Sequence, residues 1–182
     1  AVHGFNWRSA DMSAYAIPDA DPFQAARRQI DWWTRVWLED AVEPDPLLPI
    51  VEGWLRDNMP ACEDFVFCHS DYRTGNYLID EKARDISSIL DWELAHLGDF
   101  HDDVAWITCK VFGHLDEKGE FLVSGLMTRQ QFLDRYMEMS GRTIDPKTLH
   151  FYEVLNSYKV CVIMLASAFR TAVEAHNHQN VL

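Results

Sequence analysis

Three polar residues at defined spacing, Asp71, Asn76 and Asp91, are the part of the sequence that could carry chemistry. Asn76 directly precedes a run of strand-forming residues at 77–80, and Asp91 directly follows a second run at 87–90. A charged turn separates the two runs, so we expect them to pair as an antiparallel hairpin. Neighbouring strands lie about 4.8 Å apart, which brings the two ends of such a hairpin together. The oxygens of Asn76 and Asp91 could therefore share one hard cation, and Mg²⁺ prefers ligands of this kind.

The loop before this hairpin offers the other parts of a phosphoryl-transfer site, a reaction that needs chiefly a metal on the phosphates and an oriented nucleophile. Asp71 follows the apolar run 65–68, so it can face the metal site and accept the proton of a substrate hydroxyl as general base. Arg73 lies two residues further on, and its planar guanidinium could bind the transferring phosphoryl oxygens. Glu93 is a candidate to contact a second ion, directly or through water.

Each of these residues also has a purely structural interpretation, because Asp and Asn commonly form turns and cap helices. The order H-x-D-x₄-N, followed by an apolar segment and D-x-E, favours the catalytic interpretation. His69 is interpreted as structural, holding the loop by packing and hydrogen bonding. Asp99 and Asp103 lie at the start of an expected helix, where carboxylates accept hydrogen bonds from free N–H groups, so we expect them to support the site. His96 and His101 are expected at the surface or behind the site.

Helices are expected on both sides of residues 65–103, which we call the central segment. Two pairs of Asp and Pro, each a cap followed by a proline at the first helical position, open helices over about 23–39 and 46–59. Further helices are expected over about 99–111 and 128–140, and a last helix opens at Asp145. The last helix carries an apolar stripe at helical spacing: Leu149, Tyr152, Leu155, Tyr158, Val162, Leu165, Phe169 and Val173. Trp33, Trp37 and Trp54 are interpreted as core, and residues 112–127, with three glycines, as an exposed excursion.

The composition favours one acidic domain that is not built for nucleic acid. The formal net charge is −13, from 16 basic and 29 acidic residues, which disfavours nucleic-acid and anionic-membrane partners. The four cysteines show no pairing pattern and are interpreted as reduced, mostly buried thiols. The longest apolar run, 160–169, is shorter than the roughly 20 residues that span a bilayer, and no signal peptide is expected. We therefore expect a cytoplasmic protein.

Around Asp71, Asn76 and Asp91 the sequence resembles the aminoglycoside phosphotransferase family, which has the protein-kinase-like fold. HSDYRTGNYLID is similar to the catalytic-loop pattern of that family, and ILDWELAHLGDFHDDVAW is similar to its metal-binding segment. The resemblance is closest to the branch related to kinase-like domains of acyl-CoA dehydrogenase fusion proteins, in which a segment like the opening HGFNW follows the hinge helix. The resemblance implies Asp71 as the catalytic residue and Asn76 and Asp91 as magnesium ligands. It also supports placing Arg73 toward the γ-phosphate of the bound nucleotide.

The resemblance also implies which part of the enzyme this chain holds. It covers essentially the whole chain, but only as the helical C-terminal lobe of an α+β, mainly α, fold. A complete member begins with a smaller β-rich lobe that clamps the nucleotide, and no Gly-rich loop followed by a strand-borne Lys occurs before residue 60. We therefore expect residues 1–182 to form a single lobe whose partner is the missing N-terminal lobe of the same protein. Alone, this lobe should bind MgATP weakly and turn over negligibly.

The predicted function is an ATP- and Mg²⁺-dependent phosphotransferase that moves the γ-phosphate to a hydroxyl of a small molecule. One alternative is a metal-dependent hydrolase, with ligands drawn from His69, Asp71, Asp91, His96, His101 and Asp103. Another is a kinase-like module that only binds, which the presence of Asp71, Asn76 and Asp91 together disfavours. The sequence does not choose among acceptors such as an aminoglycoside, choline, a homoserine-type alcohol, a sugar or a hydroxyacyl thioester. The acceptor pocket is expected among the helices after Asp103 and residues 112–127.

Overall fold

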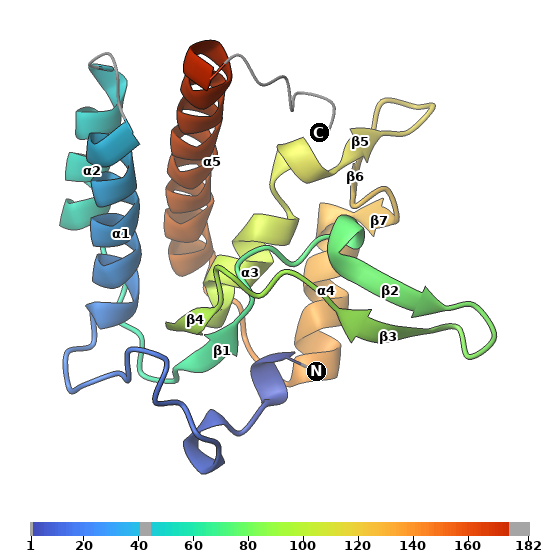
Figure 1. Ribbon diagram of the computed structural model, residues 1–182. Helices are drawn as coiled ribbons and strands as arrows, with labels where there is room; N and C mark the ends of the chain where they lie inside the picture. The colour runs from blue at the N-terminus through green and yellow to red at the C-terminus, as the bar shows by residue number, and fades with distance from the viewer. Residues whose placement is uncertain (1, 41–44, 175–182) are drawn as a thin grey trace.

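The computed structural model describes residues 2–40 and 45–174, in which five α-helices accompany three small antiparallel sheets (Figure 1). The helices are α1 Gln24–Asp40, α2 Leu47–Asp57, α3 Phe100–Ile107, α4 Arg129–Ser140 and α5 Pro146–Glu174. The strands are β1 Val66–Cys68, β2 Tyr77–Asp80, β3 Asp85–Ile89, β4 His96–Gly98, β5 His114–Leu115, β6 Phe121–Val123 and β7 Met127–Thr128. The mainly helical α+β architecture agrees with the prediction. None of the described helices is long and apolar enough to cross a membrane.

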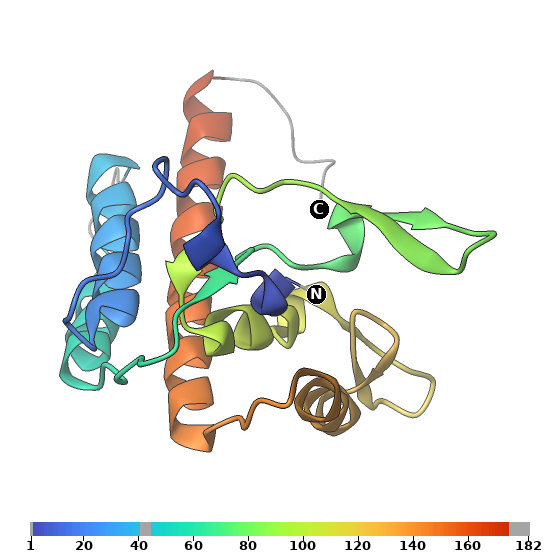
Figure 2. The ribbon, with the colours of Figure 1, turned by 90° about the horizontal axis from the view of Figure 1, so that it is seen from below.

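The core forms where three long helices meet the short central one. α1, α2 and α5 pack against one another, and α3 packs against α5 (Figures 1 and 2). Their apolar stripes meet in one cluster that includes Ile30, Leu55, Val104 and Leu155, all of them almost fully buried. Burial of these stripes is the main favourable term in folding, and it fixes the frame from which the central segment extends.

An ion pair inside this core attaches α3 to α5. Every residue of α3 is buried, including Asp102, whose carboxylate oxygens lie 2.8 and 2.9 Å from Lys159 Nζ on α5. The side chain of Asn156, also on α5, donates a hydrogen bond to the backbone oxygen of Asp102 over 2.9 Å. A charge this deeply buried is tolerated only with a partner. The sequence analysis did not predict this pair.

Two of the sheets position the central segment. β2 and β3 form the predicted antiparallel hairpin, with Tyr77 opposite Ile89. β1 pairs with β4, a strand that was not predicted, and Cys68 lies opposite His96. Cys68 ends β1 and His96 begins β4, so the start of the loop after β1 lies beside the end of the loop before β4. These loops carry Asp71 and Asp91.

The prediction for α4 is confirmed in detail. The Thr128 side chain accepts a hydrogen bond from the Gln131 N–H, and the Gln131 side chain accepts one from the Thr128 N–H. The helix ends at Gly141, whose φ of 69° lies in the left-handed region that glycine adopts without strain. Reciprocal caps of this kind occupy two N–H groups that the helix itself leaves free.

Replacing Thr128 by Ala should lower the free energy of unfolding by about 1 kcal/mol, because the N–H of Gln131 loses its acceptor. Urea denaturation of the variant and the parent measures the difference. Thr128→Ser keeps the hydroxyl and should recover most of it. A Ser variant as unstable as the Ala variant would contradict the capping role.

One expectation about the segment after Asp103 was wrong. α3 ends at Ile107 and not near Val111, because Cys109 has an extended backbone, with φ −62° and ψ 135°, and a short 3₁₀ helix over Lys110–Phe112 follows it. Val111 is consequently 49% exposed. Residues 112–127 are exposed or half-buried except at Val123, as expected for an excursion, and they include β5, β6 and the start of β7, strands that were not predicted and that pair in order as one small sheet.

Other burial predictions hold in part. Trp33 is buried, but Trp54 is 38% exposed on α2. On α5 the predicted stripe is buried as far as Val162, whereas Leu165 is 41% exposed. The side chains of Phe169 and Val173 lie outside the described part of the chain. All four cysteines are free thiols, but only Cys62 and Cys68 are buried.

Candidate active site

Asp71 lies between β1 and the hairpin, and three side chains hold its carboxylate. Asn76 Nδ2 donates to Asp71 Oδ2 over 2.7 Å, and Trp106 Nε1 on α3 donates to Oδ1 over 3.0 Å. Arg73 Nε lies 3.1 and 3.2 Å from the two oxygens. The Asp71 side chain is still 14% exposed. The carboxylate is thus fixed in direction yet reachable, which is what a general base requires.

Asn76 lies beside Asp91 because the hairpin joins the two residues. The Leu90 N–H donates to the Asn76 backbone oxygen over 2.9 Å, which extends the pairing of β2 and β3 by one step toward Asp91. Asn76 Nδ2 is committed to Asp71, to its backbone oxygen over 2.9 Å and to its carboxylate. Asn76 Oδ1 has no hydrogen-bond partner among the described residues. The amide oxygen is therefore the atom left for a ligand.

Asp91 presents a second unused oxygen group at the same end of the hairpin. Its side chain is exposed and forms no hydrogen bond or ion pair within the described ranges. Its backbone has a φ of 64°, in the left-handed region that non-glycine residues seldom occupy. Conformations of this kind persist where neighbouring contacts impose them, and they concentrate at functional sites. An amide oxygen and a carboxylate form a hard donor set that fits Mg²⁺.

His69 connects the loop 69–76, which carries Asp71, to the residue before Asp91. Its Nε2–H donates to the Leu90 backbone oxygen over 2.9 Å, and its Nδ1 accepts from the Asp71 N–H over 3.2 Å. The imidazole is fully buried and packs against the Trp92 ring, with ring centroids 4.5 Å apart. These contacts place His69 in the framework between the two loops.

Asp103 binds the backbone at the start of the loop 69–76. We expected it to cap a helix, but the cap of α3 is Asp99. Its two carboxylate oxygens accept from the His69 N–H over 2.8 Å and from the Ser70 N–H over 2.6 Å. His3 Nε2 donates to the same carboxylate over 2.8 Å. Burial disfavours its ionised form, but the bonds from His3 and the two N–H groups outweigh burial and lower the Asp103 pKa. A lowered pKa keeps the stabilising carboxylate ionised at neutral pH; this contribution is lost only in acid.

The other acidic and histidine residues of the segment have different surroundings. Asp99 caps α3 by accepting from the His101 N–H over 3.0 Å, and His101 is buried. His101 Nδ1 donates to Asp99 over 2.6 Å, and of the two positions expected for His101, at the surface or behind the site, its burial excludes the surface. His96 Nδ1 lies 3.0 Å from Ser70 Oγ, and burial lowers its pKa more than the attraction of Asp102 raises it. Glu93 is exposed and contacts no polar group in the described chain.

Residues that the sequence analysis missed complete this framework. Trp106 binds Asp71, His3 binds Asp103, and Tyr136 lies with its hydroxyl 2.7 Å from His3 Nδ1. One signal was available for Trp106: it follows Asp103 at the i, i+3 spacing, which places both side chains on one face of α3. His3 and Tyr136 are more than a hundred residues apart in sequence, and no local pattern connects them.

The hydrolase alternative finds no support in the geometry. In the described part of the chain, one group of three potential ligands of the His, Cys, Asp and Glu types lies close enough to share an ion: His3, Cys68 and Asp103. Cys68 is fully buried, and burial raises the pKa of its thiol well above the usual value. Its Sγ instead lies 3.4 Å from the Asp99 backbone oxygen, as a thiol donor. The six ligands proposed for a hydrolase do not converge.

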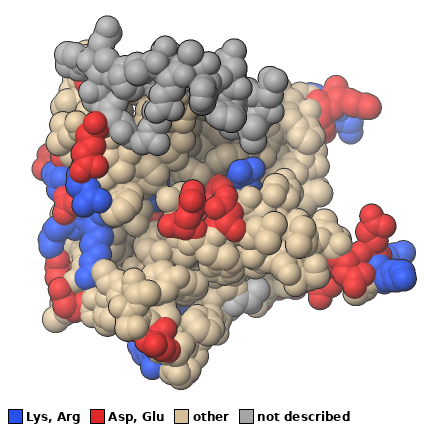
Figure 3. Space-filling view, in the orientation of Figure 1, with Lys and Arg blue, Asp and Glu red and all other residues tan. Residues whose placement is uncertain are grey.

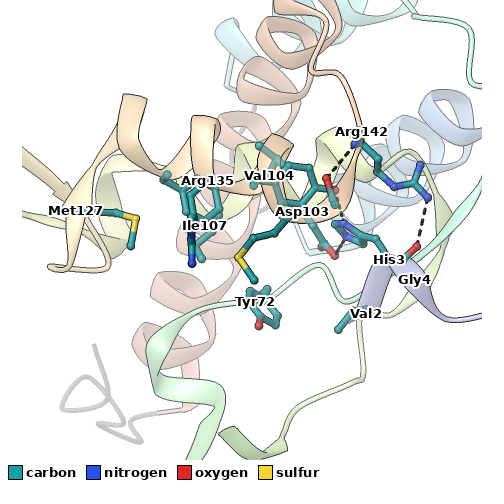
Figure 4. Close-up of a pocket in the computed structure, with 14 residues that line it drawn as sticks. Val2, His3, Gly4, Tyr72, Asp103, Val104, Ile107, Met127, Arg135 and Arg142 are labelled. Atoms are coloured by element: carbon teal, nitrogen blue, oxygen red, sulfur yellow. Dashed lines mark hydrogen bonds and ion pairs between the residues drawn. The ribbon is translucent and has the colours of Figure 1, made fainter. Parts of the chain in front are cut away.

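The surface and the cavity near this site differ in character. Figure 3 shows acidic side chains gathered near the middle of the face seen in Figure 1, a distribution that favours cations over free anions. A separate pocket of about 490 Å³ lies between α3, α4 and the N-terminal segment (Figure 4). Its lining is largely apolar and includes Ile107, Met127, Phe132 and Tyr136, and Tyr72, the residue after Asp71, closes one side. These residues come partly from the region in which we expected an acceptor pocket.

Known proteins share this fold and sequence pattern. The chain is 29% identical over 148 residues to acyl-CoA dehydrogenase family member 10 of Mus musculus, covering 75% of this chain and 13% of that protein. A solved structure from Ralstonia eutropha, assigned as an aminoglycoside phosphotransferase, superposes with a TM-score of 0.75 at 21% identity and covers 97% of this chain and 54% of that one. An aminoglycoside-3'-phosphotransferase of type VIII gives a TM-score of 0.59 at 17% identity, over 86% of this chain and 56% of its own.

These likenesses show a kinase-like phosphotransferase fold. The chain spans about a fifth of the length of most curated relatives it matches and about half of the solved structures. Residues 3–137 match the sequence pattern of the Phosphotransferase enzyme family, a span that includes Asp71, Asn76, Asp91 and Asp103. The chain belongs to the phosphotransferase enzyme family.

Proposed function

We propose that this chain is the C-terminal lobe of an enzyme that transfers the γ-phosphate of ATP to a hydroxyl of a small molecule. Asp71 is the general base, and Asn76 and Asp91 hold Mg²⁺. The arrangement of Asn76 supports this proposal: its amide nitrogen donates to Asp71, its amide oxygen has no hydrogen-bond partner among the described residues, and its backbone oxygen accepts from the N–H of Leu90, the residue before Asp91. Base and metal ligands are thereby fixed relative to each other by one side chain.

The bound metal would neutralise charge on the phosphates, and this chain's own residues would orient and deprotonate the acceptor. The acceptor hydroxyl donates its hydrogen bond to the Asp71 carboxylate, which takes the proton as the acceptor oxygen bonds to the γ-phosphorus and the bond from that phosphorus to the oxygen of the leaving ADP breaks. Arg73 uses Nε to hold Asp71, and its terminal nitrogens have no hydrogen-bond partner in the described residues. Those nitrogens can donate to phosphoryl oxygens, the role proposed for Arg73.

The hairpin also offers an apolar surface next to the proposed metal ligands. Leu78 and Leu90 are 50% and 43% exposed; Leu78 lies two residues after Asn76, and the N–H of Leu90 donates to the backbone oxygen of Asn76. A flat apolar base can cover such side chains while its phosphates reach Asn76 and Asp91. This surface supports the assignment of a nucleotide as phosphate donor.

We propose that the other half of the nucleotide site belongs to an N-terminal lobe outside this chain. The solved Ralstonia eutropha structure is nearly twice as long as the part that this chain covers. The leucines of the hairpin and the Asp91 side chain are exposed here, as the floor of a nucleotide site would be before a second lobe covers it. The isolated chain should therefore bind MgATP weakly and show negligible turnover.

Asp91→Asn tests the proposed metal site in the longer protein that carries this chain. Loss of the carboxylate charge should raise the Mg²⁺ concentration for half-maximal activity by at least about tenfold, the lower end of the effect of disturbing a metal ligand's surroundings. A coupled assay of ATP consumption over a magnesium series measures the shift.

Glu93→Gln is the matched control, because Glu93 is a neighbouring exposed carboxylate without contacts among the described residues. An equal shift in both variants would mean that the acidic surface, and not Asp91 as a ligand, sets the magnesium requirement. A second-ion role for Glu93 predicts a shift smaller than that of Asp91→Asn, with the Asn76 and Asp91 site intact.

A further inference from the structure

His3 lies in a chain of hydrogen bonds that runs from α4 to the residue before the proposed base. The Tyr136 hydroxyl on α4 lies 2.7 Å from His3 Nδ1, and His3 Nε2 donates to Asp103 over 2.8 Å. In the tautomer with a single hydrogen, on Nε2, Nδ1 accepts from the tyrosine hydroxyl. The Asp103 carboxylate in turn accepts hydrogen bonds from the backbone N–H groups of His69 and Ser70. Figure 4 shows His3 and Asp103 facing each other at the edge of the pocket.

Asp103 binds the backbone at Ser70, which has an uncommon conformation that neighbouring contacts must stabilise. Ser70 has a φ of 64°, in the left-handed region, and it directly precedes Asp71. Its N–H donates to Asp103 over 2.6 Å, while the His69 N–H and His3 share the other carboxylate oxygen. Removing His3 frees one side of that oxygen, so the carboxylate can rotate and the turn at Ser70 can relax. The direction of the Asp71 carboxylate depends on this turn.

We propose that His3 is a positioning residue for phosphoryl transfer, oriented by Tyr136 and acting through Asp103 on the loop that carries Asp71. This role rests on the proposed function of Asp71 and adds a residue far from it in sequence. It differs from general support of the fold, because the contacts of His3 are directed at the catalytic loop. A displacement of about 1 Å at a reacting group can lower a rate by roughly 10²-fold, so a small relaxation here is sufficient.

His3→Ala in the longer active protein tests the role. We expect kcat to fall by about 10–100-fold while KM for MgATP stays unchanged, because the lost interaction acts on the transition state and not on substrate binding. His3 lines the pocket, so the space left by its ring is open to a small molecule. Imidazole added to the assay should restore part of the lost kcat by donating to Asp103 in place of the ring.

Two further variants separate positioning from folding. Tyr136→Phe removes only the hydroxyl that orients His3, and it should lower kcat less than His3→Ala does. Leu38→Ala removes a side chain that is 70% exposed on α1 and does not line the pocket, and it should leave kcat unchanged. The role would be overturned by an unchanged kcat in His3→Ala, or by a loss that follows the melting temperature and does not respond to imidazole.

Amide hydrogen exchange distinguishes failure of this inference from failure of the proposed function. His3→Ala should speed exchange at the His69 and Ser70 N–H groups whether or not the protein is active. Unchanged exchange at both would overturn the inference even in an active enzyme. A different result is also possible: His3→Ala speeds exchange, but the parent protein transfers no phosphate to any acceptor. That result would overturn the assignment of Asp71 as a base, and the positioning role in catalysis with it.

Discussion

Replacing Asp71 by Asn in the longer protein is expected to lower kcat by about 10²–10⁴-fold, the range associated with losing a general base. The amide oxygen can keep only one of the hydrogen bonds that Asn76 Nδ2 and Trp106 Nε1 donate to the two carboxylate oxygens, and the amide cannot take the proton of the acceptor hydroxyl. The fold should be little affected, since Asp71 is anchored at the rim of the core and not within it. Steady-state kinetics at saturating MgATP measures the effect, with melting temperature as a check on folding.

Two comparisons make this result specific to Asp71. Asp57→Asn removes an exposed carboxylate from the last turn of α2, outside the proposed site, and should leave kcat unchanged. Trp106→Phe keeps the base but removes one of its three donors, so its effect should be much smaller than that of Asp71→Asn. An Asp71→Asn enzyme with the activity of the parent would end the assignment of Asp71 as the base.

Replacing Lys159 by Met should cost about 3–5 kcal/mol of folding free energy, because it leaves the Asp102 carboxylate buried without its partner. The two side chains are 1% and 2% exposed, so water cannot replace the lost contact. Denaturant unfolding followed by fluorescence would report the loss, and such a change lowers the folded-to-unfolded ratio by about two to four orders of magnitude.

The double variant Asp102→Asn with Lys159→Met provides the control, since it removes both charges. It should recover much of the stability, because neutral groups of similar volume can replace a buried ion pair at little cost. Arg135→Gln, which breaks the exposed pair of Arg135 and Glu138, should change stability by less than about 1 kcal/mol. A Lys159→Met protein as stable as the parent would show that Asp102 is not charged in the fold.

Local patterns predicted the hairpin and α4 from the sequence, and the structure agrees with both. Two strand-forming runs around a charged turn were sufficient for β2 and β3. Thr128 and Gly141 marked the ends of α4, because the cap and the left-handed residue are properties of single positions. The adjacency of Asn76 and Asp91 followed from the hairpin. These features depend on residues close together in the chain.

Features that depend on distant partners were not predictable in the same way. β4 is three residues long and becomes a strand only by pairing with β1, about thirty residues earlier. The expectation for Asp103 assumed its nearest free N–H groups, at the start of α3, but its carboxylate binds residues 33 and 34 positions away. The ion pair of Asp102 and Lys159 spans 57 positions, and the bond of His3 to Asp103 spans 100. Only the packed fold brings such groups together.

Calorimetric titration of Mg²⁺ into the longer protein, with and without ATP, tests the proposed site most directly. Two oxygen ligands hold magnesium weakly, so we expect binding chiefly in the presence of ATP, whose phosphates complete the coordination. Asp91→Asn should greatly weaken that nucleotide-dependent binding. Tight binding of one or two transition-metal ions without nucleotide, or magnesium binding that is identical in Asp91→Asn, would contradict a phosphotransferase site built on Asn76 and Asp91.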